Sequence, residues 1–155
     1  MILIGLIDFS EPFAKRISPR ALPEPKTEIQ KQGLRYERKV VKALKTRGLE
    51  LEHNPWFQLR DGTGRCPDII IHKLIPDYSI VVEVKLSSTA MALAKLRFVY
   101  CPMVTMATGI KTLPLVITRD ITNASMADLF FNDSILTAIQ SSSPVYVWPG
   151  NGPIA

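Results

Sequence analysis

Three charged side chains in two neighbouring apolar segments have the types and the spacing needed for metal-assisted chemistry. Asp68 begins an isoleucine run, and Glu83 and Lys85 lie fifteen and seventeen positions later in the apolar run 80–85. Side chains alternate between the two faces of a strand, so Glu83 and Lys85 share one face and the adjacent valines, Val82 and Val84, take the other. Pairing of the two segments through a turn at Pro76-Asp77 would bring Asp68 and Glu83 together.

Two carboxylates held on one face repel each other unless a cation joins them. Oxygen ligands of this kind suit Mg²⁺ or Mn²⁺. The ammonium group of Lys85 could orient a water molecule or stabilise negative charge that develops on a phosphate. The alternative is that Glu83 and Lys85 form a cross-strand surface pair and that Asp68 is a satisfied turn carboxylate.

A third acid, Glu37, falls on the apolar side of a predicted helix. On a helical wheel of residues 34–47 it lies within the arc formed by Leu34, Val40, Val41 and Leu44. A carboxylate on a buried stripe is costly unless something neutralises it. A metal shared with Asp68 and Glu83 would do so.

The same helix is strongly basic. The chain carries 19 Lys and Arg against 14 Asp and Glu, and the whole excess of +5 lies in residues 1–50. The basic residues of the helix gather on another side of the wheel, and they are Arg35, Arg38, Lys39, Lys42 and Lys45. Such a surface can hold a phosphate backbone, or it can simply be a solvated helix face. We favour nucleic-acid contact because the acids lie beside it.

The elements that must position these groups follow from caps, turns and periodicity. A helix is predicted from Thr27, its N-cap, to about Arg47, before Gly48. Strands are predicted at His53–Leu59, Cys66–His72, Ile80–Lys85, Leu113–Thr118 and Val145–Trp148. Two more helices are expected, one from Ser87 or Ser88 to Tyr100, ended by Pro102, and one over most of Ser125–Gln140.

The order α-β-β-β-α-β with a further helix and short strand predicts an α/β (α+β) fold with a mixed sheet. An antiparallel meander comes first and a parallel crossover follows, with helices on both faces. Residues 1–26 contain four prolines and predict an extended arm, and residues 27–155 predict one domain. The composition, with 46% apolar and 21% charged residues, is that of a globular chain.

No segment resembles a signal peptide, and no apolar run approaches the roughly 20 residues that span a bilayer. Two cysteines, Cys66 and Cys101, form no disulfide framework or metal-finger spacing. These features predict no membrane association and a cytoplasmic location. His53 and His72 fit no ligand or nucleophile pattern and are predicted to be ordinary surface or strand histidines. Cys66 is expected to be a small packing residue.

The acids and the lysine resemble the pattern of the PD-(D/E)XK nuclease superfamily. Glu37 on a helix precedes Pro67-Asp68 at a strand, and Glu83-Val84-Lys85 follows on the next strand. The stretch from Gly64 to Ile71 looks most like the branch that contains Holliday-junction resolvases, and the resemblance covers roughly residues 33–118. It implies a restriction-endonuclease-like fold.

The resemblance also implies roles for these residues. Asp68, Glu83 and the Val84 carbonyl would bind Mg²⁺ or Mn²⁺, Glu37 would be a further ligand, and Lys85 would help to activate the attacking water. A later helix of the family often adds a Gln or a Lys to the site, and here that helix offers Lys95. The implied activity is Mg²⁺-dependent hydrolysis of DNA phosphodiesters.

The expected DNA contacts are Arg35, Arg38, Lys39, Lys42, Arg65 and Lys95. Small size and the resolvase-like motif favour cleavage of branched or junction DNA by a homodimer, and enzymes of this type are common in phages. The alternative is a nuclease-like fold that serves as a DNA-binding or structural component of a phage particle, docked through its N-terminal arm and present in the virion. The intact set of acids argues against this alternative, and the proline-rich arm argues for it.

Overall fold

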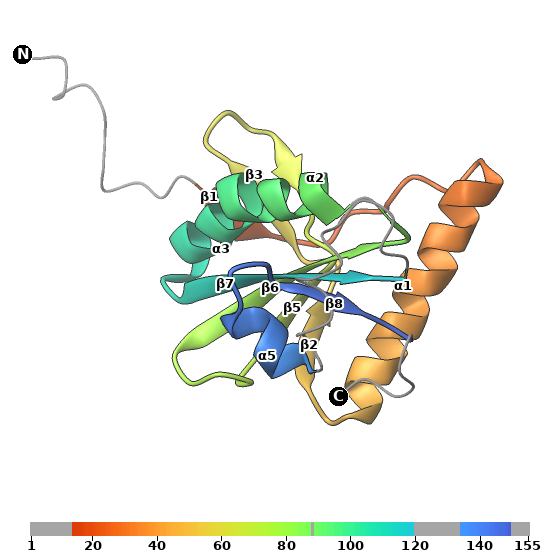
Figure 1. Cartoon of the computed structure of the whole chain (residues 1–155). Helices are drawn as coiled ribbons and strands as arrows, with labels where there is room; N and C mark the ends of the chain where they lie inside the picture. The colour runs from red at the N-terminus through yellow and green to blue at the C-terminus, as the bar shows by residue number, and fades with distance from the viewer. Residues whose placement is uncertain (1–13, 88, 120–133, 150–155) are drawn as a thin grey trace, which may run out of the picture.

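A computed structural model describes residues 14–87, 89–119 and 134–149. The chain is a mixed α/β protein with two sheets (Figure 1). The small sheet has the order β1-β3-β4, with bounds Ala14–Ile17, Trp56–Leu59 and Gly64–Arg65. The large sheet has the order β2-β5-β6-β7-β8, with bounds Glu50–His53, Ile69–His72, Tyr78–Lys85, Lys111–Thr118 and Val145–Val147.

The large sheet changes direction at its centre. Strand β5 pairs antiparallel with β2 and β6, whereas β7 runs parallel to β6 and β8 runs parallel to β7. This confirms the predicted meander followed by a parallel crossover. In the ladder of β5 and β6, Ile69 lies opposite Val82. Because the two strands are antiparallel, the next position along the ladder places Asp68 opposite Glu83.

Helix α1 (Glu28–Thr46) covers one face of the large sheet together with α5 (Ile135–Gln140). Thr27 caps α1 as predicted: its hydroxyl accepts from the Gln30 N–H, and the Gln30 side chain accepts from the Thr27 N–H. The helix ends at Arg47, and Gly48 follows with a φ of 90°, a conformation that favours glycine. The buried residues of α1 that face the sheet are Tyr36, Val40, Val41 and Leu44.

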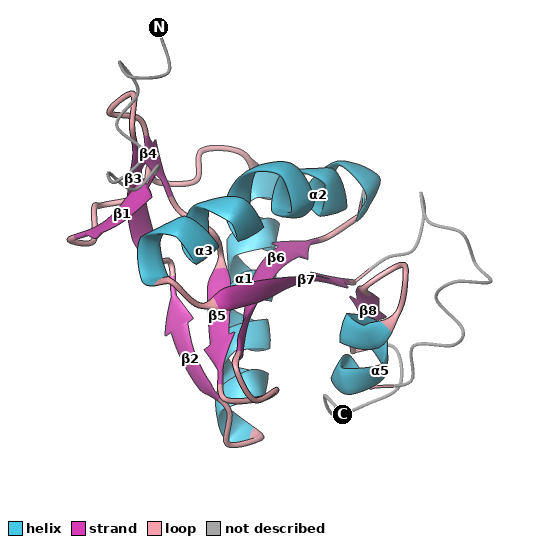
Figure 2. Cartoon of the chain, turned by 90° about the vertical axis from the view of Figure 1, so that its left-hand side faces the viewer, coloured by secondary structure: helices cyan, strands magenta, loops and turns pink. Residues whose placement is uncertain are grey.

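The opposite face carries α2 (Thr89–Lys95), a π-helical turn η2 (Leu96–Tyr100) and α3 (Cys101–Thr108), as Figure 2 shows from the side. The predicted end of this helix at Pro102 is wrong. Pro102 lies in the first turn of α3, where backbone N–H groups have no acceptor within the helix, so the N–H that proline lacks is not missed. The π-helical turn η2 separates this first turn from α2.

The segment Ala90–Thr108 is long and apolar enough to cross a membrane by length and composition, with 19 residues and a mean hydropathy of 1.2. The sequence had predicted no such run. Buried residues of this segment, including Ala92, Leu96 and Val104, pack on the sheet in the second core cluster. The core helix of a soluble protein can pass the same test, and 33% of the tested window is buried in this structure.

The strand predicted at His53–Leu59 is two strands in two different sheets. His53 ends β2, and Trp56 begins β3. Between them Asn54 has a φ of 53°, which asparagine tolerates, and Pro55 has no N–H to donate to a ladder. In the same way, the strand predicted at Cys66–His72 is confined to Ile69–His72, and Gly64–Arg65 joins the small sheet as β4.

Part of the predicted N-terminal arm is a strand. Ala14–Ile17 pairs antiparallel with β3, from Ala14 opposite Leu59 to Ile17 opposite Trp56. These four residues lie between prolines of the arm, so their N–H groups are available for a ladder. Residues 1–13 lie outside the described part of the chain, as do residues 120–133, so most of the helix predicted over Ser125–Gln140 is untested and only Ile135–Gln140 is observed as helix.

Candidate functional site

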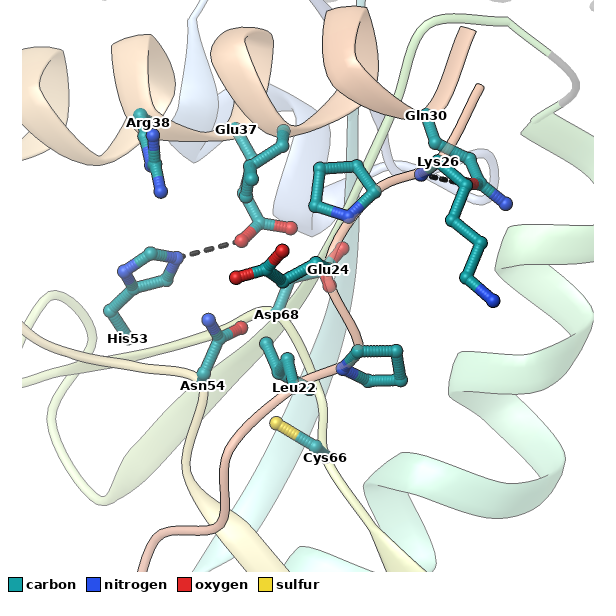
Figure 3. Close-up of a pocket in the computed structure, with 13 residues that line it drawn as sticks. Leu22, Glu24, Lys26, Gln30, Glu37, Arg38, His53, Asn54, Cys66 and Asp68 are labelled. Atoms are coloured by element: carbon teal, nitrogen blue, oxygen red, sulfur yellow. Dashed lines mark hydrogen bonds and ion pairs between the residues drawn. The ribbon is translucent and has the colours of Figure 1, made fainter. Parts of the chain in front are cut away.

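Three carboxylates from three elements converge at one end of the large sheet. Glu37 comes from α1, Asp68 precedes β5, and Glu83 lies in β6. In Figure 3 the carboxyl groups of Glu37 and Asp68 point toward each other. One oxygen of Asp68 accepts a hydrogen bond of 2.7 Å from the Val84 N–H. The structure therefore gathers the three acids that the sequence selected.

The acids are desolvated and repel one another. Burial raises the pKa of Asp68 well above its ordinary value, and the charges of Glu83 and Glu37 raise it further, while the Val84 N–H lowers it. Glu83 is 3% exposed, and burial raises its pKa although the neighbouring charges of Lys85 and Lys95 lower it. Within the described residues the Oε1 atom of Glu83 is buried and has no hydrogen-bond partner. The positive charge near the cluster does not offset the burial of Asp68 and Glu83, since both pKa values remain raised.

Two lysines border the cluster from different elements. Lys85 is half-buried at the end of β6, on the same face as Glu83, and Val82 and Val84 pack in the opposite layer as predicted. Lys95 ends α2, and its Nζ atom lies 4.9 Å from the centroid of the Tyr100 ring. Burial lowers the pKa of Lys95, but the Tyr100 hydroxyl and the carboxylates raise it, and the net pKa is raised. Lys95 therefore borders the site from the end of α2, directly before the π-helical turn.

His53 belongs to the site, although the sequence predicted an ordinary histidine. Its Nε2 atom lies 2.7 Å from a carboxylate oxygen of Glu37 (Figure 3). The next residue, Asn54, donates its N–H to the Asp68 carbonyl over 2.8 Å. No sequence signal links His53 to Glu37, because their contact exists only where the end of β2 passes beside α1.

Two of the three acids, Glu37 and Asp68, line a cavity of about 790 Å³. Glu37 and Arg38 line it from α1, and the extended segment 22–26 forms another wall, as Figure 3 shows. Cys66 also lines this cavity. Burial and the nearby carboxylates raise the pKa of the Cys66 thiol to about 12, so the thiol is protonated near neutral pH and is a poor nucleophile.

The basic residues expected on one helix face divide between two sides of α1. Arg38 borders the carboxylate cavity, whereas Arg35 and Lys39 line a separate cavity and Lys42 is exposed. Arg35 also contacts Glu28 at 2.9 Å near the helix start. The predicted basic face therefore borders two cavities, because Arg38 lies toward one edge of its arc and Lys39 at the other.

Arg65 does not lie on this helix or beside it. It is half-buried in β4, opposite Phe57 in the small sheet. Its Nε atom is buried without a hydrogen-bond partner in the described part of the chain.

The donor set fits a small, hard divalent cation. Over the described ranges, no group of three or more His, Cys, Asp and Glu side chains has the arrangement of a complete metal site. Mg²⁺ retains several waters and is often held by one or two carboxylates, so it needs no such cage. The orphaned Glu83 oxygen and the desolvated Asp68 carboxyl would both gain from a cation.

Comparison with protein-family models gives no match, and no curated protein matches the chain. The geometry of the site and the sequence motif are therefore the basis for assigning a function.

Proposed function

We propose that this chain is a Mg²⁺-dependent DNA endonuclease that hydrolyses phosphodiester bonds. One observation carries the proposal: Glu37, Asp68 and Glu83 converge from three elements, with a buried Glu83 oxygen that lacks a partner and with Lys85 and Lys95 alongside. A structural protein gains nothing from such a cluster, because buried carboxylates of like charge cost free energy. A metal-dependent phosphodiesterase requires it.

Asp68, Glu83 and the Val84 carbonyl would hold Mg²⁺ or Mn²⁺, with Glu37 as a further ligand, directly or through water. When bound, the metal supplies a water of lowered pKa and polarises the scissile phosphate. Lys85, on the same face as Glu83, would orient the attacking water. Lys95 would stabilise the negative charge that develops on the phosphate.

We also propose the restriction-endonuclease-like fold of the PD-(D/E)XK superfamily. Helix α1 with its acid precedes the meander, the Pro67-Asp68 pair leads into β5, and Glu83-Val84-Lys85 closes β6. The parallel strand β7 follows the helical segment on the other face. This succession supports the assignment because it places each motif residue at the same end of the sheet.

The proposed substrate is branched or junction DNA, and the proposed active form is a homodimer that cuts two strands. Arg38 lines the carboxylate cavity and would contact the phosphates beside the scissile bond. Basic side chains outside this cavity would bind the flanking backbone, and they are Arg35, Lys39, Lys42 and Arg65. We place the protein in the cytoplasm of a bacterium or of a phage-infected cell.

The decisive experiment incubates the protein with supercoiled plasmid, linear duplex and a four-way junction, each with Mg²⁺ and with EDTA. The proposal expects Mg²⁺-dependent cleavage, fastest on the junction. Asp68→Asn is the matched inactive control, because asparagine keeps an oxygen for the Val84 N–H. DNA binding without cleavage of any substrate would instead favour the DNA-binding or structural component of a phage particle.

A further inference from the structure

A second cavity lies on the other side of α1, away from the carboxylates. Its volume is about 350 Å³, within the range of small-ligand pockets. It is bounded by α1 and by the residues that follow β7 and β8. Its polar and aromatic lining comes from Gln32, Arg35, Tyr36, Lys39, Arg119 and Trp148.

The charge of this lining has one sign. Arg35, Lys39 and Arg119 contribute three cationic groups, and no acidic residue is among the described residues that line the cavity. The carboxylate of Glu28 contacts Arg35 from outside the lining and offsets part of its charge. A lining whose charged side chains are all basic favours an anion, and the fork of an arginine suits phosphate oxygens.

The aromatic part of the lining is held in place by hydrogen bonds. The rings of Tyr36 and Trp148 stack with centroids 6.1 Å apart, and the Tyr36 hydroxyl donates to the Trp148 carbonyl over 2.6 Å. The Trp148 N–H donates to the Thr118 carbonyl over 3.0 Å. These contacts fix the Trp148 ring at the edge of the cavity.

We propose that this cavity binds a phosphate group of a nucleotide. Arg35, Lys39 and Arg119 hold the phosphate oxygens, and Trp148 contacts the attached sugar or base. The same chemistry is offered by a free mononucleotide and by a nucleotide within a DNA strand. The role in holding a DNA strand rests on the proposed nuclease function.

The cavity is well placed for a strand that also enters the carboxylate site. Arg119 donates its backbone N–H to the Lys85 carbonyl over 3.2 Å, so the two sites share the end of β6. Tyr36 and Glu37 are consecutive in α1 and line opposite cavities. A helix with its side chains is about 10–12 Å wide, which a DNA strand crosses within a few nucleotides.

Tryptophan fluorescence can test the pocket without any cleavage. Trp56→Phe leaves Trp148 as the only tryptophan, since the chain has two. In EDTA this variant is titrated with a short thymidine oligonucleotide, with thymidine 5′-monophosphate and with inorganic phosphate. We expect saturable quenching by the oligonucleotide. Quenching by the two small ligands as well identifies a site for a free phosphate group, and quenching by the oligonucleotide alone identifies a site for a strand.

Matched variants locate the site. Lys39→Ala in the Trp56→Phe background should weaken binding roughly tenfold, and adding Arg119→Ala should weaken it further. Lys73→Ala removes one positive charge from an exposed position at the other end of the large sheet, outside both cavities, and should change affinity by less than about twofold. Circular dichroism checks that each variant is folded. No quenching, or equal losses in Lys39→Ala and Lys73→Ala, would overturn the proposal.

The outcome is separable from that of the cleavage assay. Asp68→Asn should retain the quenching of Trp148, because Asp68 lines only the other cavity. Quenching in a protein that cleaves no DNA would refute the nuclease and leave the phosphate pocket standing. Cleavage without quenching would refute the pocket and leave the nuclease standing.

Discussion

The two sides of α1 differ in charge, although they are made by neighbouring residues. On one side Glu37 meets Asp68 and Glu83, and burial raises the pKa of the last two. On the other side Arg35 and Lys39 meet Arg119. Consecutive helical residues point about 100° apart, so one helix can serve two opposite kinds of site.

The two sides also differ in how far their charges are exposed to water. The acidic side holds like charges close together in a buried place, which destabilises the metal-free protein. The cationic side keeps its charges at a more open surface, where water screens them. The acidic side should therefore control both stability and chemistry, and the cationic side should control binding alone.

The largest expected effect follows from Asp68→Asn. Cleavage in Mg²⁺ should fall by roughly 10²- to 10³-fold or more, because the variant loses a charge that would hold the metal. The metal-free protein should become more stable, since a desolvated carboxylate and its repulsion are removed. Cleavage rates and urea unfolding in EDTA measure the two effects. Wild-type activity in this variant would refute the role of Asp68 in the proposed metal site.

The next effect is the pH dependence of stability in EDTA. The folded pKa values of Asp68 and Glu83 lie above the ordinary 3.8 and 4.5. Between the ordinary and the raised pKa of each group, the folded state therefore binds more protons than the unfolded state. The free energy of unfolding should therefore fall as pH rises, by about 1.4 kcal/mol for each unit by which a pKa is raised.

Urea unfolding between about pH 5 and about pH 8 measures this slope. The difference between wild type and Asp68→Asn isolates the contribution of Asp68 from that of the histidines. Identical slopes in the two proteins would mean that the carboxyl of Asp68 is not desolvated in solution.

Glu37→Gln should have a smaller effect. Glutamine keeps the shape and can still contact His53, but it removes one negative charge from the site. Mg²⁺ affinity measured by calorimetry should fall by about 10- to 100-fold, and the metal-free protein should be as stable as wild type or more stable. Glu28→Gln, at an exposed position of the same helix, is the control and should leave Mg²⁺ binding unchanged. Unfolding of Glu37→Gln would show that Glu37 is instead a structural partner of His53.

The smallest effect concerns the cationic residues taken together. Changing Arg38, Lys39 and Lys42 to Ala should weaken DNA binding on all sequences and reduce the salt slope by up to about 0.9 for each lost phosphate contact. Fluorescence anisotropy over a range of salt concentrations measures the slope. Lys73→Ala with Lys111→Ala, at the other end of the large sheet, is the control and should leave it unchanged. Equal slopes in both sets would place the DNA path elsewhere.

Local patterns predicted most of the large sheet and of helix α1. Alternation along β6 placed Glu83 and Lys85 on one face and the adjacent valines on the other. The helical wheel placed Glu37 among residues that face the sheet. Thr27 and Gly48 marked the helix ends. These features depend on sterics and hydrogen bonds within a few residues, which a sequence displays directly.

The elements that were predicted wrongly depend on pairing between segments far apart in the chain or on a π-helical turn. The segment from His53 to Leu59 is predicted as one strand, but its pairing with two different partners, β5 and β1, divides it between two sheets. Pro102 is typical of a helix end, but the π-helical turn η2 before it leaves Pro102 in the first turn of α3, where proline is tolerated. Local propensity specifies neither the distant pairing partners nor the π-helical turn.

The sequence by itself determined which residues can do chemistry here: the three acids, the two lysines beside them and the excess of basic residues in the first third of the chain. Only the tertiary structure decided which of these groups lie together around each cavity. It placed His53 in contact with Glu37, divided the basic residues of α1 between two cavities, and placed Arg119 and Trp148 around the same cavity as Lys39. Periodicity encodes the face on which a side chain lies, whereas the neighbour that it meets depends on contacts between segments far apart in the chain.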